Sequence, residues 1–290
     1  SRTMKNAQEI YEGVEIKGHG TIGLITYLRT DSTRVSETAE VQVKEFIESK
    51  YGDSYMAKEI NSKKSNKKIQ DAHEAIRPTD VNLMPEEVKD QLPRDLFRLY
   101  QLIWRRFVAS RMENSVYETT NVKVNAGKYI FNASTSKLDF DGFMKVYTDS
   151  DNEKVVTNNT IAKLEKDSKL EFEKFEENQH FTQPPAHFTE AALVKAMEEQ
   201  GIGRPSTYAP TITTIIARRY VTREKKNLYV TELGEAVNNV MKTEFSVIVD
   251  TQFTANMESL LDAVEEGTIE WKTVIRNFYP DLKEQVENAE

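Results

Sequence analysis

The chain has 290 residues, a formal net charge of −8 and an isoelectric point of about 5.3, with 30% of its residues charged. This length is enough for two or three domains, each with its own core. The sequence contains no cysteine, which excludes disulfides and thiolate metal sites and fits a reducing, cytoplasmic setting. It has no run of about eighteen apolar residues and no apolar signal-peptide core, so we expect no membrane insertion and no export.

Residues 1–112 predict a mainly helical domain. The expected elements, in chain order, are a helix over 3–14, a strand over 22–28, a helix over 34–52 between Ser36 as N-cap and Gly52, a mobile lysine-rich loop over 61–71, and two helices that begin near Pro85 and Pro93. Aromatic positions such as Trp104 and Phe107 fall at helical core spacing, and we assign them to packing. The same assignment is made for Trp271.

Residues 113–186 change from a helical to an alternating period and predict a β-rich region. A hairpin is expected around Gly127, and the segment 169–179 alternates again as a further strand. Paired prolines at 184 and 185 suit a linker after this region.

Residues 187–290 predict a helical domain that begins like a winged helix. A helix with Thr189 near its N-cap ends at Gly201, a second helix starts close to Pro205, and two β-type segments joined by a basic turn follow over 220–231. Three acidic amphipathic helices complete the chain. Within this acidic domain, residues 201–226 carry six basic groups against Glu224 alone, so a phosphate-binding surface is compatible with the negative total.

The stretch ITYLRTDST, residues 25–33, surrounds one phenol with phosphate-compatible groups. A tyrosine hydroxyl with an ordinary pKa near 10 is a poor nucleophile at neutral pH unless it is assisted. In a strand, Arg29 would project from the same face as Tyr27 and could hold a phosphate oxygen during attack. On local evidence alone, a structural role explains the same residues: a tyrosine at a strand end, followed by a turn and a helix cap.

Two further segments carry candidate anion-binding groups. In DAHEAIRPT, residues 71–79, a helix would place His73 and Arg77 on one face, where both could contact one anionic oxygen. The alternative is an exposed helix end that stops at Pro78.

In GIGRPSTY, residues 201–208, the start of a helix, the hydroxyls of Ser206 and Thr207, and Arg204 could together surround a phosphate. With Gly201 as a C-cap and Ser206 as an N-cap, the same residues need no ligand.

Several chemistries have no support in the sequence. It contains no G-x-x-x-x-G-K-[ST] motif, which argues against a P-loop ATPase. The four histidines do not have zinc spacing, and no obvious acidic cluster supports a magnesium site within this chain.

Five segments together closely resemble the bacterial type IA DNA topoisomerases, in particular the topoisomerase I branch. They are GLITYLRTDSTRVS, QDAHEAIRPTDV, LYQLIWRRFVASRM, HFTEAALVKAMEEQGIGRPSTYAPTITTI and FTANMESLLDAV. The resemblance runs through nearly all 290 residues and implies a multi-domain α and β fragment of the family's torus. In it, 1–112 would be the helical domain with the active-site tyrosine, 113–186 part of the β-rich arch, and 187–290 the winged-helix-like DNA-binding domain.

The resemblance implies that Tyr27 attacks a backbone phosphate of single-stranded DNA and forms a 5′-phosphotyrosine. Arg29 would steady that phosphate, and His73 would lie at the same active site. The resemblance further implies that strand passage and religation relax negative supercoils without ATP. The residues expected to bind DNA are Arg77, Arg204, Ser206, Thr207 and Arg218.

Members of this family begin with a magnesium-binding TOPRIM domain, and nothing like it precedes Ser1. We therefore expect a fragment that binds single-stranded DNA but cleaves it poorly or not at all, with Mg²⁺ needed by the longer protein. A monomer in the bacterial cytoplasm, associated with the nucleoid and not with a membrane, is expected. The competing hypotheses are a non-enzymatic winged-helix DNA-binding module, with Tyr27 structural, and an architectural protein without salt-dependent affinity for single strands.

Overall fold

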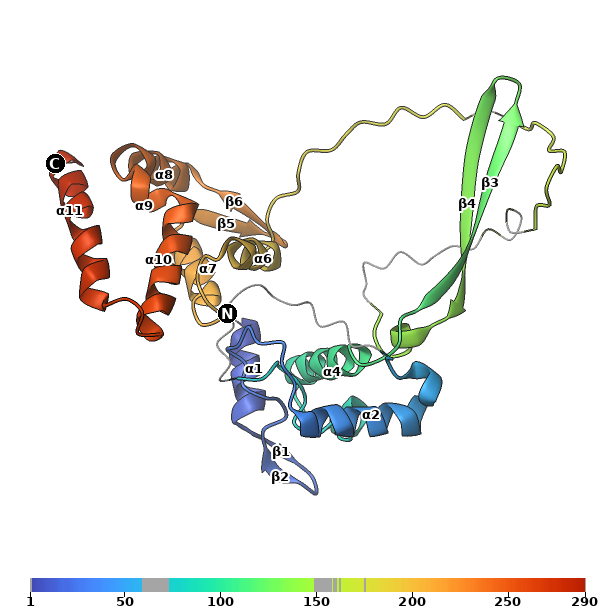
Figure 1. Ribbon diagram of the computed structural model, residues 1–290, viewed down its shortest axis with the longest axis horizontal. Coiled ribbons are helices and arrows are strands. Elements are labelled where there is room, and N and C mark those ends of the chain that lie inside the picture. The colour runs from blue at the N-terminus through green and yellow to red at the C-terminus, as the bar shows by residue number, and fades with distance from the viewer. Residues whose placement is uncertain are drawn as a thin grey trace. The chain divides into compact units, whose positions relative to one another are not determined.

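The computed structural model describes residues 2–58, 73–148, 158, 161, 163–174 and 176–289. The chain divides into two compact units, residues 5–180 and residues 181–290 together with 1–4. Helices and small antiparallel sheets occur along it (Figure 1), which confirms the predicted α and β fold class. The loop predicted over 61–71 lies outside the described residues. No helix within the described ranges is both long enough and apolar enough to span a bilayer.

The elements before residue 181 begin with α1 and end with a long hairpin. They are α1 (Arg2–Glu12), β1 (Val14–Ile16), β2 (Gly20–Ile22), α2 (Glu37–Tyr51), the 3-10 turn η1 (Asp53–Tyr55), α3 (Pro85–Val88), α4 (Arg94–Ala109), β3 (Val116–Ala126), β4 (Tyr129–Phe140) and the 3-10 turn η2 (Gly142–Lys145). The strand predicted over 22–28 is wrong, because the β1–β2 pairing ends at Ile22 and, from residue 23 to residue 28, only Ile25 makes an isolated bridge.

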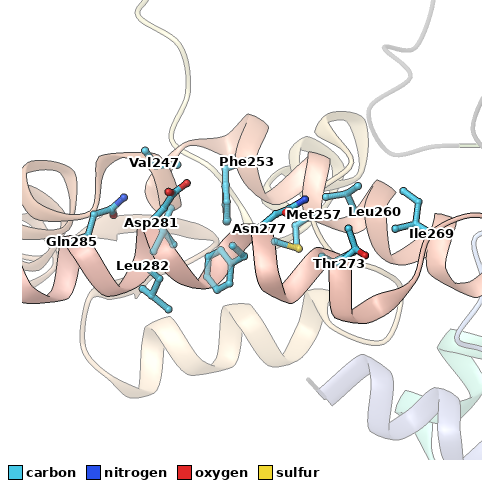
Figure 2. A pocket seen from close by; sticks show the side chains of 13 residues that line it. Val247, Phe253, Met257, Leu260, Ile269, Thr273, Asn277, Asp281, Leu282 and Gln285 are labelled. Carbon is cyan, nitrogen blue, oxygen red and sulfur yellow. The ribbon is translucent and has the colours of Figure 1, made fainter.

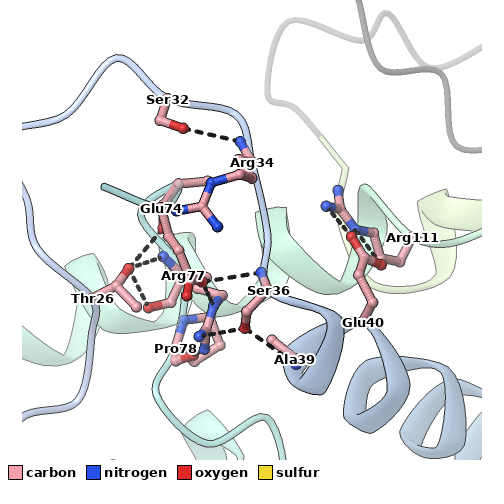
Figure 3. A network of polar contacts seen from close by, with 11 residues as sticks. Thr26, Ser32, Arg34, Ser36, Ala39, Glu40, Glu74, Arg77, Pro78 and Arg111 are labelled. Atoms are coloured by element: carbon pink, nitrogen blue, oxygen red, sulfur yellow. Dashed lines mark hydrogen bonds and ion pairs between the residues drawn. The ribbon is translucent and has the colours of Figure 1, made fainter. Parts of the chain in front are cut away.

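Helix α2 has the caps that its sequence predicts. The Ser36 side chain accepts a hydrogen bond from the Ala39 amide, and Gly52 follows the last residue with a φ of 95°. The carboxylate of Glu40 pairs with the guanidinium of Arg111 at 2.7 Å, which ties α2 to the chain just after α4 (Figure 3). This ion pair supplements the buried apolar face of α2 and fixes how the two helices lie.

Helix α4 contributes the largest buried side chains of this unit. Tyr100 and Trp104 are buried, and the polar atom of each donates to a carbonyl in the loop before α3. The Tyr100 hydroxyl donates to the Leu83 carbonyl at 2.6 Å, and the Trp104 Nε1 donates to the Val81 carbonyl at 2.9 Å. The packing roles predicted for Trp104 and Phe107 are confirmed. Burial of its side chain raises the pKa of Tyr100, so the hydroxyl remains a donor.

Strands β3 and β4 form the hairpin predicted around Gly127, which has a φ of 62° at the turn. The further strand predicted over 169–179 is wrong for the described residues of that segment, since none of them is in a strand. Alternation alone does not form a strand without a hydrogen-bonded neighbour. Leu170 and Phe172 on this segment are exposed.

The elements after residue 180 follow the predicted order of helix, turn, helix and hairpin, which confirms the winged-helix-like arrangement of its start. They are α6 (Glu190–Gln200), α7 (Tyr208–Ala217), β5 (Val221–Glu224), β6 (Asn227–Val230), α8 (Glu232–Glu244), α9 (Ser246–Val249), α10 (Thr251–Glu265) and α11 (Trp271–Ala289). Thr189 caps α6 by accepting from the Ala192 amide at 3.1 Å, and Gly201 ends it with a φ of 73°.

Helices α9, α10 and α11 surround an apolar cavity of about 260 Å³ (Figure 2). Phe253 of α10 and Phe278 of α11 meet in it, with ring centroids 5.8 Å apart. Gln285 lies at one end, and its Oε1 is buried without a hydrogen-bond partner among the described residues. The packing role predicted for Trp271 is wrong, because this side chain is 59% exposed at the first turn of α11.

Candidate active site and DNA-binding surface

The structure brings Tyr27 and His73 into contact. Their ring centroids lie 4.6 Å apart with the planes inclined by 39°. Tyr11 of α1 approaches Tyr27 edge to face, at 5.6 Å between centroids and 71° between planes. Tyr27 is half-buried and His73 is exposed. The phenol is therefore held between two rings while the imidazole stays accessible to solvent.

Hydrogen bonds between two distant segments cause this contact. The Thr26 amide donates to the Arg77 carbonyl at 2.9 Å, and the Thr79 amide donates to the Leu24 carbonyl at 3.0 Å. Residues 73–79 thus lie beside residues 24–26 and are not helical, so the helix predicted over 71–79 is wrong for its described part. Proline at 78 disfavours helical geometry in the residue before it, which leaves the segment free to pair.

Glycine 23 allows α1 to approach the Tyr27 segment. A Cβ built on this residue would lie 2.4 Å from the carbonyl oxygen of Tyr11, closer than real side chains come. The Leu24 amide donates to the Ile10 carbonyl at 2.8 Å at the same place. The glycine in the sequence GLITY is therefore needed to bring Tyr11 against Tyr27.

Arg29 lies two residues after Tyr27 and is exposed. Because the predicted strand does not reach this position, the argument that both side chains share one strand face does not hold. What remains is a solvent-accessible guanidinium close to the phenol in sequence, a group suited to an anionic oxygen.

Arg77 directs its guanidinium into the protein (Figure 3). Its Nε donates to Glu74 Oε2 at 2.9 Å, its Nη1 to the Pro78 carbonyl at 2.9 Å, and its Nη2 to Ser36 Oγ at 3.4 Å. Burial alone would raise the pKa of Glu74, but hydrogen bonds from Arg77 and from the Ser36 amide lower it below its ordinary value. In this structure, Arg77 is part of an internal network.

The loop between α6 and α7 is held by reciprocal hydrogen bonds. The Arg204 amide donates to Thr207 Oγ1 at 2.9 Å, and the Thr207 hydroxyl donates back to the Arg204 carbonyl at 3.1 Å. Helix α7 begins at Tyr208 with Thr207 at the N-cap position, one residue after the predicted Ser206. Ser206 and Thr207 are both exposed, as a phosphate-contacting pair requires.

Arg204 itself is paired with carboxylates of α10. Its Nη2 donates to both oxygens of Asp262 at 2.8 Å, and its Nη1 lies 3.4 Å from Glu258 Oε2. Burial alone would lower the pKa of Arg204, but the hydrogen bond to Asp262 and the two negative charges outweigh this and raise it. The guanidinium is therefore charged and largely neutralised locally.

The remaining basic groups of residues 201–226 differ in their surroundings. Arg218 is the exposed C-cap of α7, and Arg219 beside it is exposed with a φ of 60°. Arg223 of β5 pairs with Glu190 at 2.9 Å. Internal pairing thus offsets part of the local positive charge that the sequence predicts.

Sequence reasoning missed the partners that hold these candidate residues. Glu258 and Asp262 are four residues apart on α10, inside the segment FTANMESLLDAV, and that spacing was an available signal for an acidic pair on one helix face. Thr26 and Tyr11 gave no comparable signal, because their roles depend on contacts with distant segments.

The described residues do not fit a magnesium site. Among them, no group of three or more histidine, aspartate or glutamate side chains lies close enough together to hold a metal ion.

Comparison with known proteins gives the family of the chain. The sequence profile of the DNA topoisomerase family matches residues 1–276. Among solved structures, the fold is similar to that of full-length topoisomerase I from Thermotoga maritima, with a TM-score of 0.77 and 39% sequence identity. The match covers 97% of this chain and 45% of the Thermotoga maritima chain, so this chain spans less than half the length of that protein. The chain belongs to the bacterial type IA DNA topoisomerase family.

Proposed function

We propose that this chain supplies the nucleophile and part of the DNA-binding surface of a type I DNA topoisomerase. The observation that carries the proposal is the contact of Tyr27 with His73, at 4.6 Å between ring centroids, on two segments that pair through their backbones. Two residues that the family resemblance assigns to one active site are thus neighbours in space.

In the proposed reaction, the Tyr27 hydroxyl loses its proton and attacks the phosphorus of a backbone phosphate in a single strand. A bond forms between the phenolic oxygen and phosphorus, and the bond from phosphorus to the 3′ oxygen breaks. The leaving oxygen takes up a proton and becomes a free 3′-hydroxyl, while the 5′ phosphate stays on the tyrosine. Because one phosphate ester replaces another, the reverse step rejoins the strand and no ATP is consumed.

His73 and Arg29 are the proposed partners of this phosphate. The exposed imidazole beside the phenol can hydrogen-bond a phosphate oxygen, and the exposed guanidinium can stabilise charge that develops on the phosphoryl group. Positioning and electrostatic stabilisation are the main contributions that a protein makes to phosphoryl transfer.

For the second unit, we propose contacts to the phosphates of the single strand. Ser206 would donate from the α6–α7 loop, and Thr207 would donate after giving up its hydrogen bond to the Arg204 carbonyl. Arg218 would donate from the end of α7, and Arg204 would donate with N–H groups that do not bond Asp262 or Glu258. These contacts position the strand without reading its sequence.

Magnesium enters only as a property of the family. Because the family resemblance assigns the magnesium ligands to a TOPRIM domain that these 290 residues do not include, we propose that they alone bind single-stranded DNA but cleave it poorly. We further propose that the protein acts as a monomer on negatively supercoiled DNA in the bacterial cytoplasm, at the nucleoid.

The test is covalent trapping in the full-length enzyme that contains these residues. The enzyme is incubated with a labelled single-stranded oligonucleotide, denatured, and examined for DNA attached to protein. Tyr27→Phe should abolish the adduct, whereas Tyr11→Phe, a matched change in the neighbouring ring, should retain it. Oligonucleotide binding without any adduct from the unaltered enzyme is the result expected of a DNA-binding module, and it would overturn the proposal.

A further inference from the structure

Four polar side chains connect the Tyr27 segment with the His73 segment, and we call them the Arg77 clamp: Thr26, Ser36, Glu74 and Arg77 (Figure 3). The Thr26 hydroxyl donates to the Ala75 carbonyl at 2.7 Å and accepts from the Arg77 amide at 2.9 Å. The Glu74 carboxylate accepts from Arg77 Nε at 2.9 Å and from the Ser36 amide at 3.3 Å. The Thr26 contacts join the two segments directly. The Glu74 contacts link residues within the His73 segment and tie that segment to Ser36.

Two residues of the Arg77 clamp are neighbours in sequence of the proposed active-site residues. Thr26 directly precedes Tyr27, and Glu74 directly follows His73. A change in the clamp therefore shifts the backbone from which a proposed reacting side chain projects. Since a misplacement of about 1 Å can cost about 10²-fold in rate, this placement matters for chemistry more than for affinity.

The guanidinium of Arg77 has little access to DNA. Its side chain is 12% exposed and that of Glu74 is 25% exposed, so the ion pair is mostly shielded from water. All three of its nitrogens donate hydrogen bonds within the protein. Two of its five N–H groups make none of these bonds, so low exposure, rather than a lack of donors, limits its contact with a phosphate.

We propose that Arg77 and Glu74 are positioning residues that hold His73 against Tyr27, and that Arg77 does not bind DNA directly. This inference rests on the proposed role of Tyr27 as nucleophile. It replaces the phosphate contact that the sequence suggested for Arg77 with a contact between two segments of the protein.

The experiment compares Glu74→Gln, Arg77→Gln and the milder Thr26→Val in the full-length enzyme. Each variant is measured for the single-turnover rate of adduct formation and for the dissociation constant of the same oligonucleotide at several salt concentrations. We expect adduct formation to slow by about tenfold or more. The dissociation constant should stay within about twofold, and its salt dependence should not change. Arg98→Gln, an exposed arginine on α4, is the matched control and should alter neither.

A spectroscopic measurement separates positioning from loss of fold. With the tyrosines labelled as fluorotyrosine, the fluorine signal of Tyr27 should move in all three variants because the nearby imidazole ring shifts, while signals from the tyrosines of α4 and β4 stay in place. Thr26→Val keeps side-chain volume and loses only the hydroxyl, so it should show the effect in a folded protein.

Two results would overturn the clamp. Weaker binding of Arg77→Gln, with a salt slope reduced by about one, would show a direct phosphate contact instead. An unchanged cleavage rate in Glu74→Gln and Thr26→Val would show that the clamp does not position the site. In the same assay, an adduct from Tyr27→Phe would instead refute the proposed nucleophile, so the two failures are distinguishable.

Discussion

Arg204 donates two hydrogen bonds of 2.8 Å to the carboxylate of Asp262, across 58 residues of sequence. A cation expected to meet a DNA phosphate is therefore already neutralised by a carboxylate of its own unit. The pair anchors the α6–α7 loop to α10, and it also competes with any phosphate for the same guanidinium. Removal of the carboxylate would weaken the anchoring of the α6–α7 loop, but it would also free the Arg204 guanidinium for a phosphate.

We expect Asp262→Asn to strengthen binding of a single-stranded oligonucleotide by about two- to fivefold, the range of a partly exposed ion pair. The amide keeps the shape of the carboxylate and one acceptor, but it no longer neutralises Arg204. Fluorescence anisotropy at low salt measures the change. Glu270→Gln removes the same charge from an exposed position and should have a smaller effect. Weaker binding by Asp262→Asn would mean that anchoring of the loop outweighs competition.

Gln285→Met should stabilise the second unit by about 1–2 kcal/mol. The Gln285 Oε1 is buried beside the apolar cavity without a partner among the described residues, and burying an unsatisfied acceptor carries a desolvation cost of this size. Methionine has a similar length and fills such space without a polar atom. The urea midpoint should rise with an unchanged m-value, and a lower midpoint would show that the amide has a partner.

Tyr100→Phe should destabilise the helical part of the first unit by about 1–2 kcal/mol. The change leaves the buried Leu83 carbonyl without its donor at 2.6 Å, while the ring still fills the core. Tyr129→Phe, at an exposed position on β4, serves as the control and should leave the urea midpoint unchanged. Equal midpoints for both variants would refute a structural role for the Tyr100 hydroxyl.

The Glu74–Arg77 pair should make the free energy of unfolding depend on pH. The pKa of Glu74 is lowered in the folded state, so its ionised form contributes stability above the ordinary carboxyl value, and that contribution is lost as the pH falls through the lowered pKa. Glu74→Gln should therefore be clearly less stable than the unaltered chain near neutral pH, and the difference should shrink as the pH falls through the lowered pKa. A difference that stays constant with pH would assign the loss to packing instead of charge.

Local signals predicted the helices well. Ser36 and Gly52 at the ends of α2, and Thr189 and Gly201 at the ends of α6, act through neighbours within four residues, so the sequence contains the whole cause. The hairpin at Gly127 is equally local. The buried face of α4 was harder to predict from the sequence, since Leu102 falls at core spacing yet is 50% exposed.

Nonlocal pairing explains the failed predictions. Residues 73–79 are not helical because they hydrogen-bond to residues 24–26, about fifty positions earlier, and helical propensity cannot anticipate that partner. The strand predicted after Ile22 failed for a related reason, since its backbone donors bond to a loop and to α1 instead of a long strand. At the candidate site, the resemblance identified Tyr27 and His73, but the ion pairs of Arg77 and Arg204 became visible only in three dimensions.

The identity of the DNA-linked residue tests the central claim most directly. After trapping with the full-length enzyme, trypsin should release residues 18–29, because the sequence has Lys17 before this peptide and Arg29 at its end. Tyr27 is the single tyrosine in that peptide, and mass spectrometry should find the nucleotide attached to it. Attachment instead to the preceding peptide, residues 6–17 with Tyr11, or to any other part of the chain would contradict the account.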